Sequence, residues 1–266
     1  MCFAMQRIDL KKRDHQFKVG NECPDFEANL EQDAIFYENN EVVGFYIRDL
    51  ANHSEKAASY ANIANAEFLS KRVPKSTMKR SSGLFDEENE VLQYSTILGG
   101  VPPKPHMRRP YPTMSSVHNV VSARTFVKAM SLLCRESENI IKKISPELFE
   151  RQVKIISESV EEKWRLGRMF TSSISNYNIS ANFHIDNANI KNTVNIIIAK
   201  RNNARGGHTT VPDYGVTVKS LDNSMLVYPA WRNLHAVTPI KTLNNQGYRN
   251  TLVFYPLKAF SKISAD

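Results

Sequence analysis

The alternation of apolar and polar residues changes near residue 170 and divides the chain into two parts. Before that point, apolar residues recur every three or four positions in several stretches, which is typical of amphipathic helices. After it, short runs of β-branched and aromatic residues are separated by turn-forming residues, which is typical of strands. The sequence therefore predicts mainly helices in its first part and a sheet-rich core in its second.

The first part predicts one hairpin and three helices. Residues 34–48 hold two aromatic and β-branched runs with a polar turn between them, a pattern that predicts two paired strands. Ser54 and Ser122 precede two apolar stripes and are expected to be their N-caps. Ser145-Pro146 combines an N-cap with a proline at the first helical position, so we expect a third helix that continues to Gly167.

The second part predicts a series of short strands separated by glycine, asparagine and proline. The expected strands cover residues 170–175, 179–185, 193–200, 209–211, 216–219, 224–228, 234–237 and 248–255. Many short strands at regular spacing favour a sandwich or a barrel. The fold class that we expect is therefore a β-rich α+β fold.

Composition is that of an ordinary soluble globular protein. The chain has 266 residues, 41% of them hydrophobic and 23% charged, which suits one sizeable domain. No apolar run is long enough to span a membrane, and the N-terminus lacks the apolar core of a signal peptide. Cys2, Cys23 and Cys134 match neither a zinc spacing nor a disulfide framework. We expect a reducing compartment, the cytoplasm or, in a eukaryote, the nucleus.

The chain is basic, with a net charge of +8, which favours acidic partners and nucleic acid foremost. Basic residues gather in two proline- and serine-rich stretches, 71–83 and 99–112, which predict exposed loops. Each is either a solvated loop or a contact for nucleic-acid phosphates. Lys200, Arg201 and Arg205 form a third candidate for phosphate contacts.

His184 and Asp186 lie two residues apart in a strand-like run, so their side chains are expected to leave the same face. An imidazole nitrogen and a carboxylate oxygen that point into one cavity supply two metal ligands. His235, in a later strand-like run, is the best candidate for the third. Two histidines and one carboxylate form the ligand set of non-haem Fe(II) oxygenases. The alternative is a polar pair on a solvent-facing strand, because seven histidines readily produce His-x-Asp by chance.

Arg249 lies in an otherwise apolar, strand-like run, where alternation puts Arg249, Thr251, Val253 and Tyr255 on one face. A guanidinium inside a barrel is costly unless an anion pairs with it. No acidic residue lies nearby in sequence, so we expect a small carboxylate ligand, with the Thr251 hydroxyl as a further donor. The alternative is a buried ion pair with an acidic residue that is distant in sequence.

Five residues thus form an ordered set: His184-x-Asp186, His235 and Arg249-x-Thr251. This set resembles the motif of the Fe(II)/2-oxoglutarate-dependent dioxygenases. The resemblance implies that His184, Asp186 and His235 hold Fe(II). It implies that Arg249 and Thr251 bind the far carboxylate of 2-oxoglutarate, and that O₂ is the oxidant.

The same resemblance implies a fold. Members of this superfamily have a double-stranded β-helix, or jelly-roll, core with flanking helices. We therefore expect a single oxygenase domain over residues 1–266. Residues 1–169 would form N-terminal hairpin and helical support, and residues 170–260 the double-stranded β-helix.

Asn189 extends the motif to His-x-Asp-x-x-Asn, which is similar to the TET/J-binding-protein branch of the superfamily. Members of that branch hydroxylate the methyl group of 5-methylcytosine or thymine in nucleic acid. The resemblance implies that Asn189 reads an extruded base and that Tyr255 lies against it. The chain departs from TET enzymes at Leu257, where they have a histidine, and it lacks their cysteine-rich zinc region. The identity of the base therefore stays open.

The function that we expect is hydroxylation of the methyl group of a pyrimidine base in DNA. A base inside a duplex cannot reach a buried iron, so the substrate would be a flipped or single-stranded base. Two alternatives remain at this stage. One is a protein or amino-acid hydroxylase of the same superfamily, and the other is a basic nucleic-acid-binding module without turnover. No membrane partner is expected, and the sequence leaves the oligomeric state open.

Overall fold

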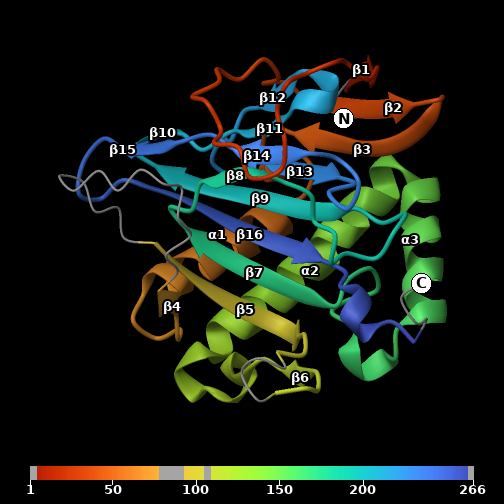
Figure 1. Ribbon diagram of the computed structural model, residues 1–266. Helices are drawn as coiled ribbons and strands as arrows, with labels where there is room; N and C mark the ends of the chain where they lie inside the picture. Colours follow the sequence, from red (N-terminus) through yellow and green to blue (C-terminus); the bar gives the residue numbers. More distant parts are fainter. Residues whose placement is uncertain (1–4, 78–92, 105–108, 263–266) are drawn as a thin grey trace.

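Two main β-sheets, a separate two-stranded pair and three α-helices form the computed structural model, which describes residues 5–77, 93–104 and 109–262 (Figure 1). Four basic or titratable residues of the two proline-rich stretches therefore lie outside the described residues: Lys79, Arg80, His106 and Arg108. The helices are α1 (Glu55–Leu69), α2 (Arg124–Ile144) and α3 (Pro146–Ser159). Among the residues that the structure describes, no helix combines the length and the apolar content that crossing a membrane requires.

The larger sheet has ten strands, almost all of them antiparallel to their neighbours. Its order is β1 (Gln6–Asp9), β2 (Ala34–Glu38), β3 (Glu41–Ile47), β13 (Met225–Tyr228), β9 (Asn195–Asn202), β16 (Tyr248–Tyr255), β7 (Ser172–Tyr177), β5 (Tyr94–Val101) and β4 (Ser76–Thr77), with β6 (Thr113–Met114) beside β5. The N-terminal strands thus extend the same sheet on both sides of the strands predicted after residue 170.

The smaller sheet has four strands, in the order β12 (Val216–Val218), β11 (Thr209–Val211), β14 (His235–Val237) and β8 (Ala181–His184). A separate pair joins β10 (Ala204–Gly206) to β15 (Ile240–Thr242). Apolar side chains of both sheets, such as Leu226 and Val211, meet in one buried cluster between them. The two sheets therefore enclose an interior, and the predicted β-rich α+β class is confirmed.

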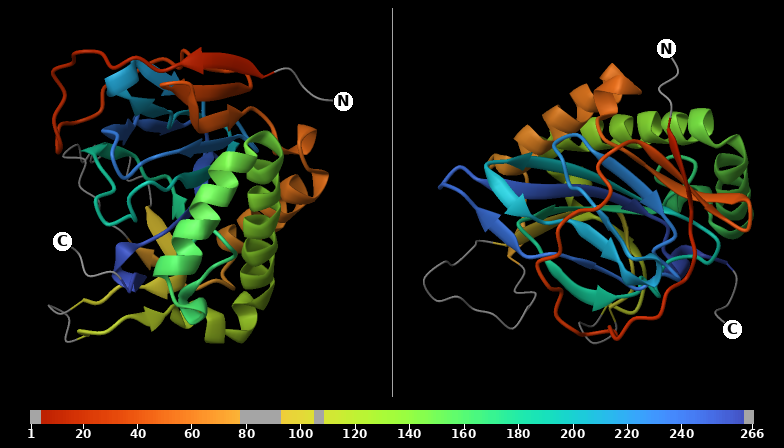
Figure 2. Two further views of the ribbon diagram at one scale, coloured as in Figure 1. Left: turned by 90° about the vertical axis from the view of Figure 1, so that its right-hand side faces the viewer. Right: turned by 90° about the horizontal axis from the view of Figure 1, so that it is seen from above.

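The three helices pack against one face of the larger sheet (Figure 2). Phe126 and Met130 of α2 belong to the same buried cluster as Ile198 of β9 and Leu252 and Phe254 of β16. Alternation along β16 then directs Arg249 and Thr251 to the opposite face, into the space between the sheets. The apolar stripes of the helices therefore support the sheet from behind and leave its inner face for polar side chains.

Local signals placed most of these elements correctly. The β2–β3 hairpin turns at Asn39 and Asn40, whose φ values of 51° and 64° suit a two-residue turn. Ser54 caps α1 by accepting a hydrogen bond from the Ala57 backbone N–H at 3.1 Å. Ser145 caps α3 in the same way, with Pro146 at its first position.

Two helix boundaries were wrong. Ser122 does not cap α2, because α2 begins two residues later and the Ser122 hydroxyl donates to the Arg72 carbonyl at 2.7 Å. The third helix ends at Ser159 rather than Gly167. Val160 adopts an extended conformation and forms a β-bridge with Ser261, which draws the backbone out of the helix.

All eight predicted strands occur, but the short strands β1, β4, β6, β10 and β15 were not predicted, and neither was the longer β5. Its C-terminal part contains Gly99 and Gly100, which weaken a strand signal. Gly99 has a φ of 81°, and a Cβ atom there would lie 2.6 Å from the Thr171 carbonyl oxygen of the adjoining segment. Glycine therefore permits the close approach that lets β5 pair with β7 and continue the larger sheet.

Candidate metal and cosubstrate site

His184, Asp186 and His235 come together at one edge of the smaller sheet. His184 ends β8, and His235, which begins β14, is its direct partner in the antiparallel register. Asp186 lies beyond the end of β8, yet its Oδ1 is 3.7 Å from His184 Nε2 and 4.0 Å from His235 Nε2. The three ligand atoms all lie within 4.8 Å of one another. The neighbouring strands thus place three donor groups around one point.

Backbone carbonyls fix the orientation of both imidazoles. His184 Nδ1 lies 2.7 Å from the Asn182 carbonyl oxygen, and His235 Nδ1 lies 2.9 Å from that of Asn233. Because a carbonyl oxygen can only accept, each Nδ1 carries a proton, which leaves each Nε2 as the ring nitrogen available to a metal ion. Burial, and next the charge of His184, lower the pKa of His235 to about 4, so it is neutral at pH 7.

The cluster is enclosed on one side and open on the other. The side chain of His235 is 5% exposed, whereas those of His184 and Asp186 are 34% and 33% exposed. Two imidazoles and one carboxylate, with an accessible face, are the donor set of non-haem Fe(II) sites. The residues present therefore fit an iron ion.

Arg249 lies on β16 with only 3% of its surface exposed. Its Nε donates to the Ser220 hydroxyl at 3.1 Å, and no acidic side chain of the described residues forms an ion pair with it. Burial and the nearby Arg201 lower the pKa of Arg249 to about 9, so the guanidinium keeps its charge at pH 7. The alternative of an internal acid is thus not observed, and the pocket is suited to an external anion.

Three residues near Arg249 were not assigned to this pocket from the sequence: Arg201, His208 and Ser220. Arg201, the direct neighbour of Arg249 across the β9–β16 register, donates to the carbonyls of Ser220 and Ala204. Burial, and then the charges of Arg201 and Arg249, lower the pKa of His208 to about 4. His208 Nδ1 accepts from the Ser220 N–H at 3.2 Å, so its Nε2 bears the proton. The pocket therefore contains several hydrogen-bond donors and an excess of positive charge. The position of Arg201 beside Arg249 follows from the strand register and could not be read from the sequence.

Thr251 and Gly207 complete the pocket around Arg249. Thr251 is buried two residues farther along β16, and its hydroxyl accepts from the Asn176 amide at 3.3 Å. Gly207 has a φ of 69°, and a Cβ atom there would lie 2.9 Å from Arg249 Cγ. The backbone at Gly207 therefore packs directly on the aliphatic part of Arg249 and requires a glycine.

The two predicted base contacts, Asn189 and Tyr255, lie on neighbouring segments, because Asn189 forms a β-bridge with Leu257. Asn189 is 5% exposed, and its amide donates to Asn195 Oδ1 at 2.8 Å. Tyr255 is half-buried and packs in a cluster with Ile190. The structure thus gives the Asn189 amide an internal partner, and the base-reading role of both residues stays a prediction.

The third basic candidate for phosphate contacts was mostly wrong. Lys200 is 4% exposed, and its ammonium group donates to side chains of Asn62, Asp222 and Asn223. Arg201 points into the Arg249 pocket, as described above. Only Arg205 of this group is exposed. Lys200 lies on a central strand, and its partners come from segments distant in sequence. The residues next to it in sequence therefore do not show that it is buried and paired.

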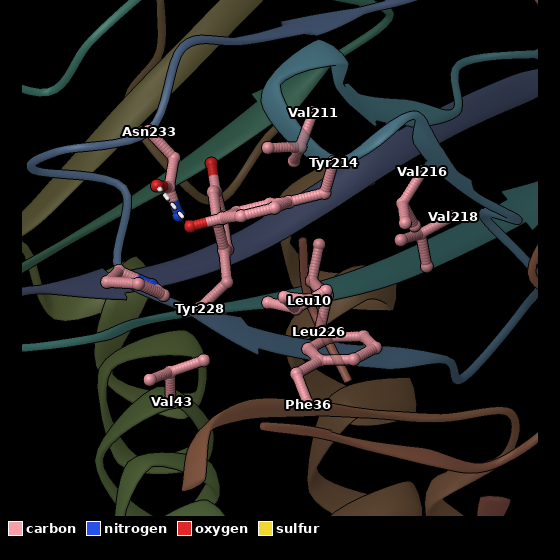
Figure 3. Close-up of a pocket in the computed structure, with 11 residues that line it drawn as sticks. Leu10, Phe36, Val43, Val211, Tyr214, Val216, Val218, Leu226, Tyr228 and Asn233 are labelled. Carbon is pink, nitrogen blue, oxygen red and sulfur yellow. Dashed lines mark hydrogen bonds between the residues drawn. The ribbon is translucent and has the colours of Figure 1, made fainter. Parts of the chain in front are cut away.

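Tyr228, whose ring lies against His235, also lines an apolar cavity (Figure 3). The Tyr228 ring and the His235 imidazole are nearly perpendicular, at 84°, with ring centroids 5.3 Å apart. The residues that line the cavity include Leu10, Val211 and Leu226, and none of the seven predicted site residues is among them. This cavity therefore belongs to the packing behind His235 and not to the polar site.

Comparison with known families decides the class of the protein. The family model Tet_JBP, described as the oxygenase domain of the 2OGFeDO superfamily, matches residues 103–258, more than half of the chain. The chain belongs to this family. It is thus a 2-oxoglutarate- and Fe(II)-dependent dioxygenase, and the matched segment contains all seven predicted site residues. The chemistry of the superfamily uses Fe(II), 2-oxoglutarate and O₂.

Solved structures show the fold of the oxygenase. NgTET1 in complex with 5mC DNA is 13% identical, with a TM-score of 0.59, and the match covers 98% of this chain and 85% of that chain. A 2OG-Fe(II) oxygenase from Burkholderia pseudomallei is 12% identical, with a TM-score of 0.48 and coverage of 77% and 83%. A prolyl hydroxylase from Trichoplax adhaerens is also 12% identical, with a TM-score of 0.43 and coverage of 80% and 83%.

The expected double-stranded β-helix core with flanking helices is confirmed by the likeness to NgTET1. No curated protein matches the sequence.

Proposed function

We propose that the oxygenase hydroxylates the methyl group of a pyrimidine base in DNA. In this proposal His184, Asp186 and His235 hold Fe(II), and Arg249 with Thr251 holds 2-oxoglutarate. The observation that carries it is the pairing of two features inside one barrel. Three ligand atoms lie within 4.8 Å of one another, and the buried guanidinium of Arg249 has no ion pair with an acid of the described residues.

The chain supplies positioning and charge for this reaction. Bound iron would couple the oxidative decarboxylation of 2-oxoglutarate by O₂ to hydroxylation of the substrate. The two imidazoles would bind the ion through Nε2, and Asp186 would offset part of its charge. The charges of Arg249 and Arg201 neutralise a carboxylate, and the Thr251 hydroxyl lies on the same strand face. Because these groups are held by backbone and strand contacts, little reorganisation accompanies binding.

Three observations support DNA as the substrate. The chain matches the Tet_JBP family model, its net charge is +8, and the similar structure of NgTET1 contains 5mC DNA. The exposed side of His184 and Asp186 marks where a substrate would enter. A base must leave the duplex to reach this cluster, so we infer a flipped or single-stranded base. Asn189 and Tyr255 are the candidates for contact with that base, and Arg205 for a phosphate contact.

The test is a nucleoside profile after incubation with Fe(II), 2-oxoglutarate and ascorbate. Single-stranded and duplex DNA with 5-methylcytosine or thymine should gain one hydroxyl per methyl group while succinate accumulates. His184→Ala should abolish both products without weakening DNA binding. If peptides gain oxygen and DNA does not, the oxygenase is a protein hydroxylase and the proposal is wrong. If DNA is bound but no succinate forms, the chain is a binding module and the proposal is equally wrong.

A further inference from the structure

Asn195 is a buried amide that joins Asp186 to Asn189. It is the first residue of β9 and pairs with Tyr228 of β13, and only 3% of its surface is exposed. Its Nδ2 donates to Asp186 Oδ2 at 2.9 Å, and its Oδ1 accepts from Asn189 Nδ2 at 2.8 Å. Asn189 Nδ2 also lies 3.5 Å from Asp186 Oδ2. The three side chains therefore form a closed hydrogen-bonded group.

These contacts give the two carboxylate oxygens of Asp186 different surroundings. Oδ2 faces the two amides, whereas Oδ1 is the atom nearest to His184 Nε2 and His235 Nε2. A carboxylate held in this way presents one oxygen to a cation and cannot rotate without losing the bond to Asn195. Groups that orient a metal ligand from behind in this manner commonly change metal affinity when they are altered.

The backbone on either side of Asp186 is already anchored. The Asp186 N–H donates to the Ala230 carbonyl at 3.1 Å. The Ile190 N–H donates to the Pro256 carbonyl at 2.9 Å, and the Lys258 N–H donates to the Ala188 carbonyl at 2.9 Å. The remaining freedom of Asp186 lies in its side-chain torsions, and Asn195 is placed to restrict them.

An amide meets both requirements at position 195. It donates to a carboxylate and at the same time accepts from Asn189, which neither an ionised carboxylate nor an apolar side chain can do. Replacing it with an apolar residue leaves Asp186 Oδ2 without the shorter of its two hydrogen bonds to the amides. The structure therefore explains why this strand begins with an asparagine.

We propose that Asn195 is the positioning residue for Asp186 in the metal site, and that Asn189 completes the group. This inference rests on the proposed assignment of His184, Asp186 and His235 as metal ligands. It gives the Asn189 amide a structural partner, so a base would compete with Asn195 for that amide. The first effect of changes at Asn195 is then on metal binding, before any effect on substrate.

The test measures the affinity for Mn²⁺, a redox-stable probe, by electron paramagnetic resonance of the free ion under anaerobic conditions. Asn195→Leu, of similar volume, and the smaller Asn195→Ser should both bind Mn²⁺ about 10- to 100-fold more weakly than the wild type. The matched control is Asn65→Leu. Asn65 is a buried asparagine of α1 whose amide donates to the Tyr248 hydroxyl and accepts from Asn250. Asn65→Leu should cost stability and leave Mn²⁺ affinity unchanged.

A double-mutant cycle with Asp186→Ala separates positioning from general destabilisation. If Asn195 acts through Asp186, Asn195→Leu should cause no further loss of Mn²⁺ affinity once Asp186 is alanine. An equal loss in both backgrounds, or wild-type affinity in a folded Asn195 variant, would overturn the inference. If Asp186→Ala itself leaves Mn²⁺ affinity unchanged, the assignment of the metal ligands is wrong, which is a different result.

Discussion

The metal cluster and the Arg249 pocket lie in the same barrel interior but have opposite electrostatic character. The cluster holds two imidazoles and one carboxylate, each already fixed by a backbone carbonyl or an amide. The pocket instead collects the guanidiniums of Arg249 and Arg201 beside a neutral His208. Their hydrogen bonds go to neutral oxygens, so the positive charge in the pocket is left largely unbalanced.

This difference shows which kind of ligand each region stabilises. The cluster gains a cation at little cost, because its lone pairs already converge and one side is open. In the pocket, buried positive charge lowers the stability of the fold until an anion binds. An account in which iron and 2-oxoglutarate occupy these two regions therefore predicts different responses to mutation in each.

The largest effect is expected in the cluster. His235→Ala should lower succinate formation by at least about 100-fold, because even changes behind a metal ligand cost 10- to 100-fold. Mn²⁺ affinity should fall together with turnover. The control is His53→Ala, since His53 pairs with Asp33, whose other oxygen accepts from the Arg48 N–H. Full turnover in a folded His235→Ala protein would remove this residue from the metal site.

The next largest effect is expected at Arg249. Removing one partner of a buried charge pair costs about 2–5 kcal/mol, so Arg249→Leu should raise the KM for 2-oxoglutarate about 100-fold. Without 2-oxoglutarate the same change removes an unpaired buried charge, so the melting temperature should rise. Steady-state kinetics and thermal unfolding check the two signs separately. An unchanged KM would mean that the carboxylate binds elsewhere.

A smaller effect is expected at Gly207. An alanine Cβ would meet Arg249 Cγ at 2.9 Å and would force a residue with a side chain to adopt a φ of 69°. Gly207→Ala should therefore raise the KM for 2-oxoglutarate about tenfold, while Mn²⁺ affinity stays near the wild-type value. Gly20→Ala is the control, because Gly20 has a φ of 92° with no atom within 4 Å of the added Cβ. It should cost stability alone, and an equal rise in KM would contradict the account.

The smallest effect is expected at Ser220, whose hydroxyl accepts from Arg249 Nε. Ser220→Ala should raise the KM for 2-oxoglutarate about fivefold, in line with about 1 kcal/mol for one hydrogen bond. The control is Ser173→Ala, since the buried Ser173 hydroxyl has no hydrogen-bond partner in the part of the chain that the structure describes. A response at Ser173 that equals the response at Ser220 would show that the hydrogen bond is not the cause.

The sequence predicted the residues of the metal cluster more completely than those of the Arg249 pocket. His184, Asp186 and His235 were found because the ligand types and their order are themselves the signal. Arg249 was found because a charge stands out in an apolar strand. Arg201 was misread as a surface contact, since its place beside Arg249 depends on the β9–β16 register.

Asn195 gave no sequence signal at all. Its hydrogen bond to Asp186 spans a loop and a change of sheet, which no local pattern encodes. The fold shows the same limit, because strands with clear alternation were predicted and β5, with its two glycines, was not. Short-range patterns thus predict elements and ligand types, whereas the contacts that orient those ligands require the tertiary structure.

The most direct test of the central claim is a crystal structure of the oxygenase with Mn²⁺ and 2-oxoglutarate, using the anomalous signal of the metal. The account predicts one metal peak bound by His184 Nε2, His235 Nε2 and Asp186 Oδ1. It also predicts a carboxylate of 2-oxoglutarate on the guanidinium of Arg249. A metal peak away from these three atoms, or a carboxylate that avoids Arg249, would contradict it.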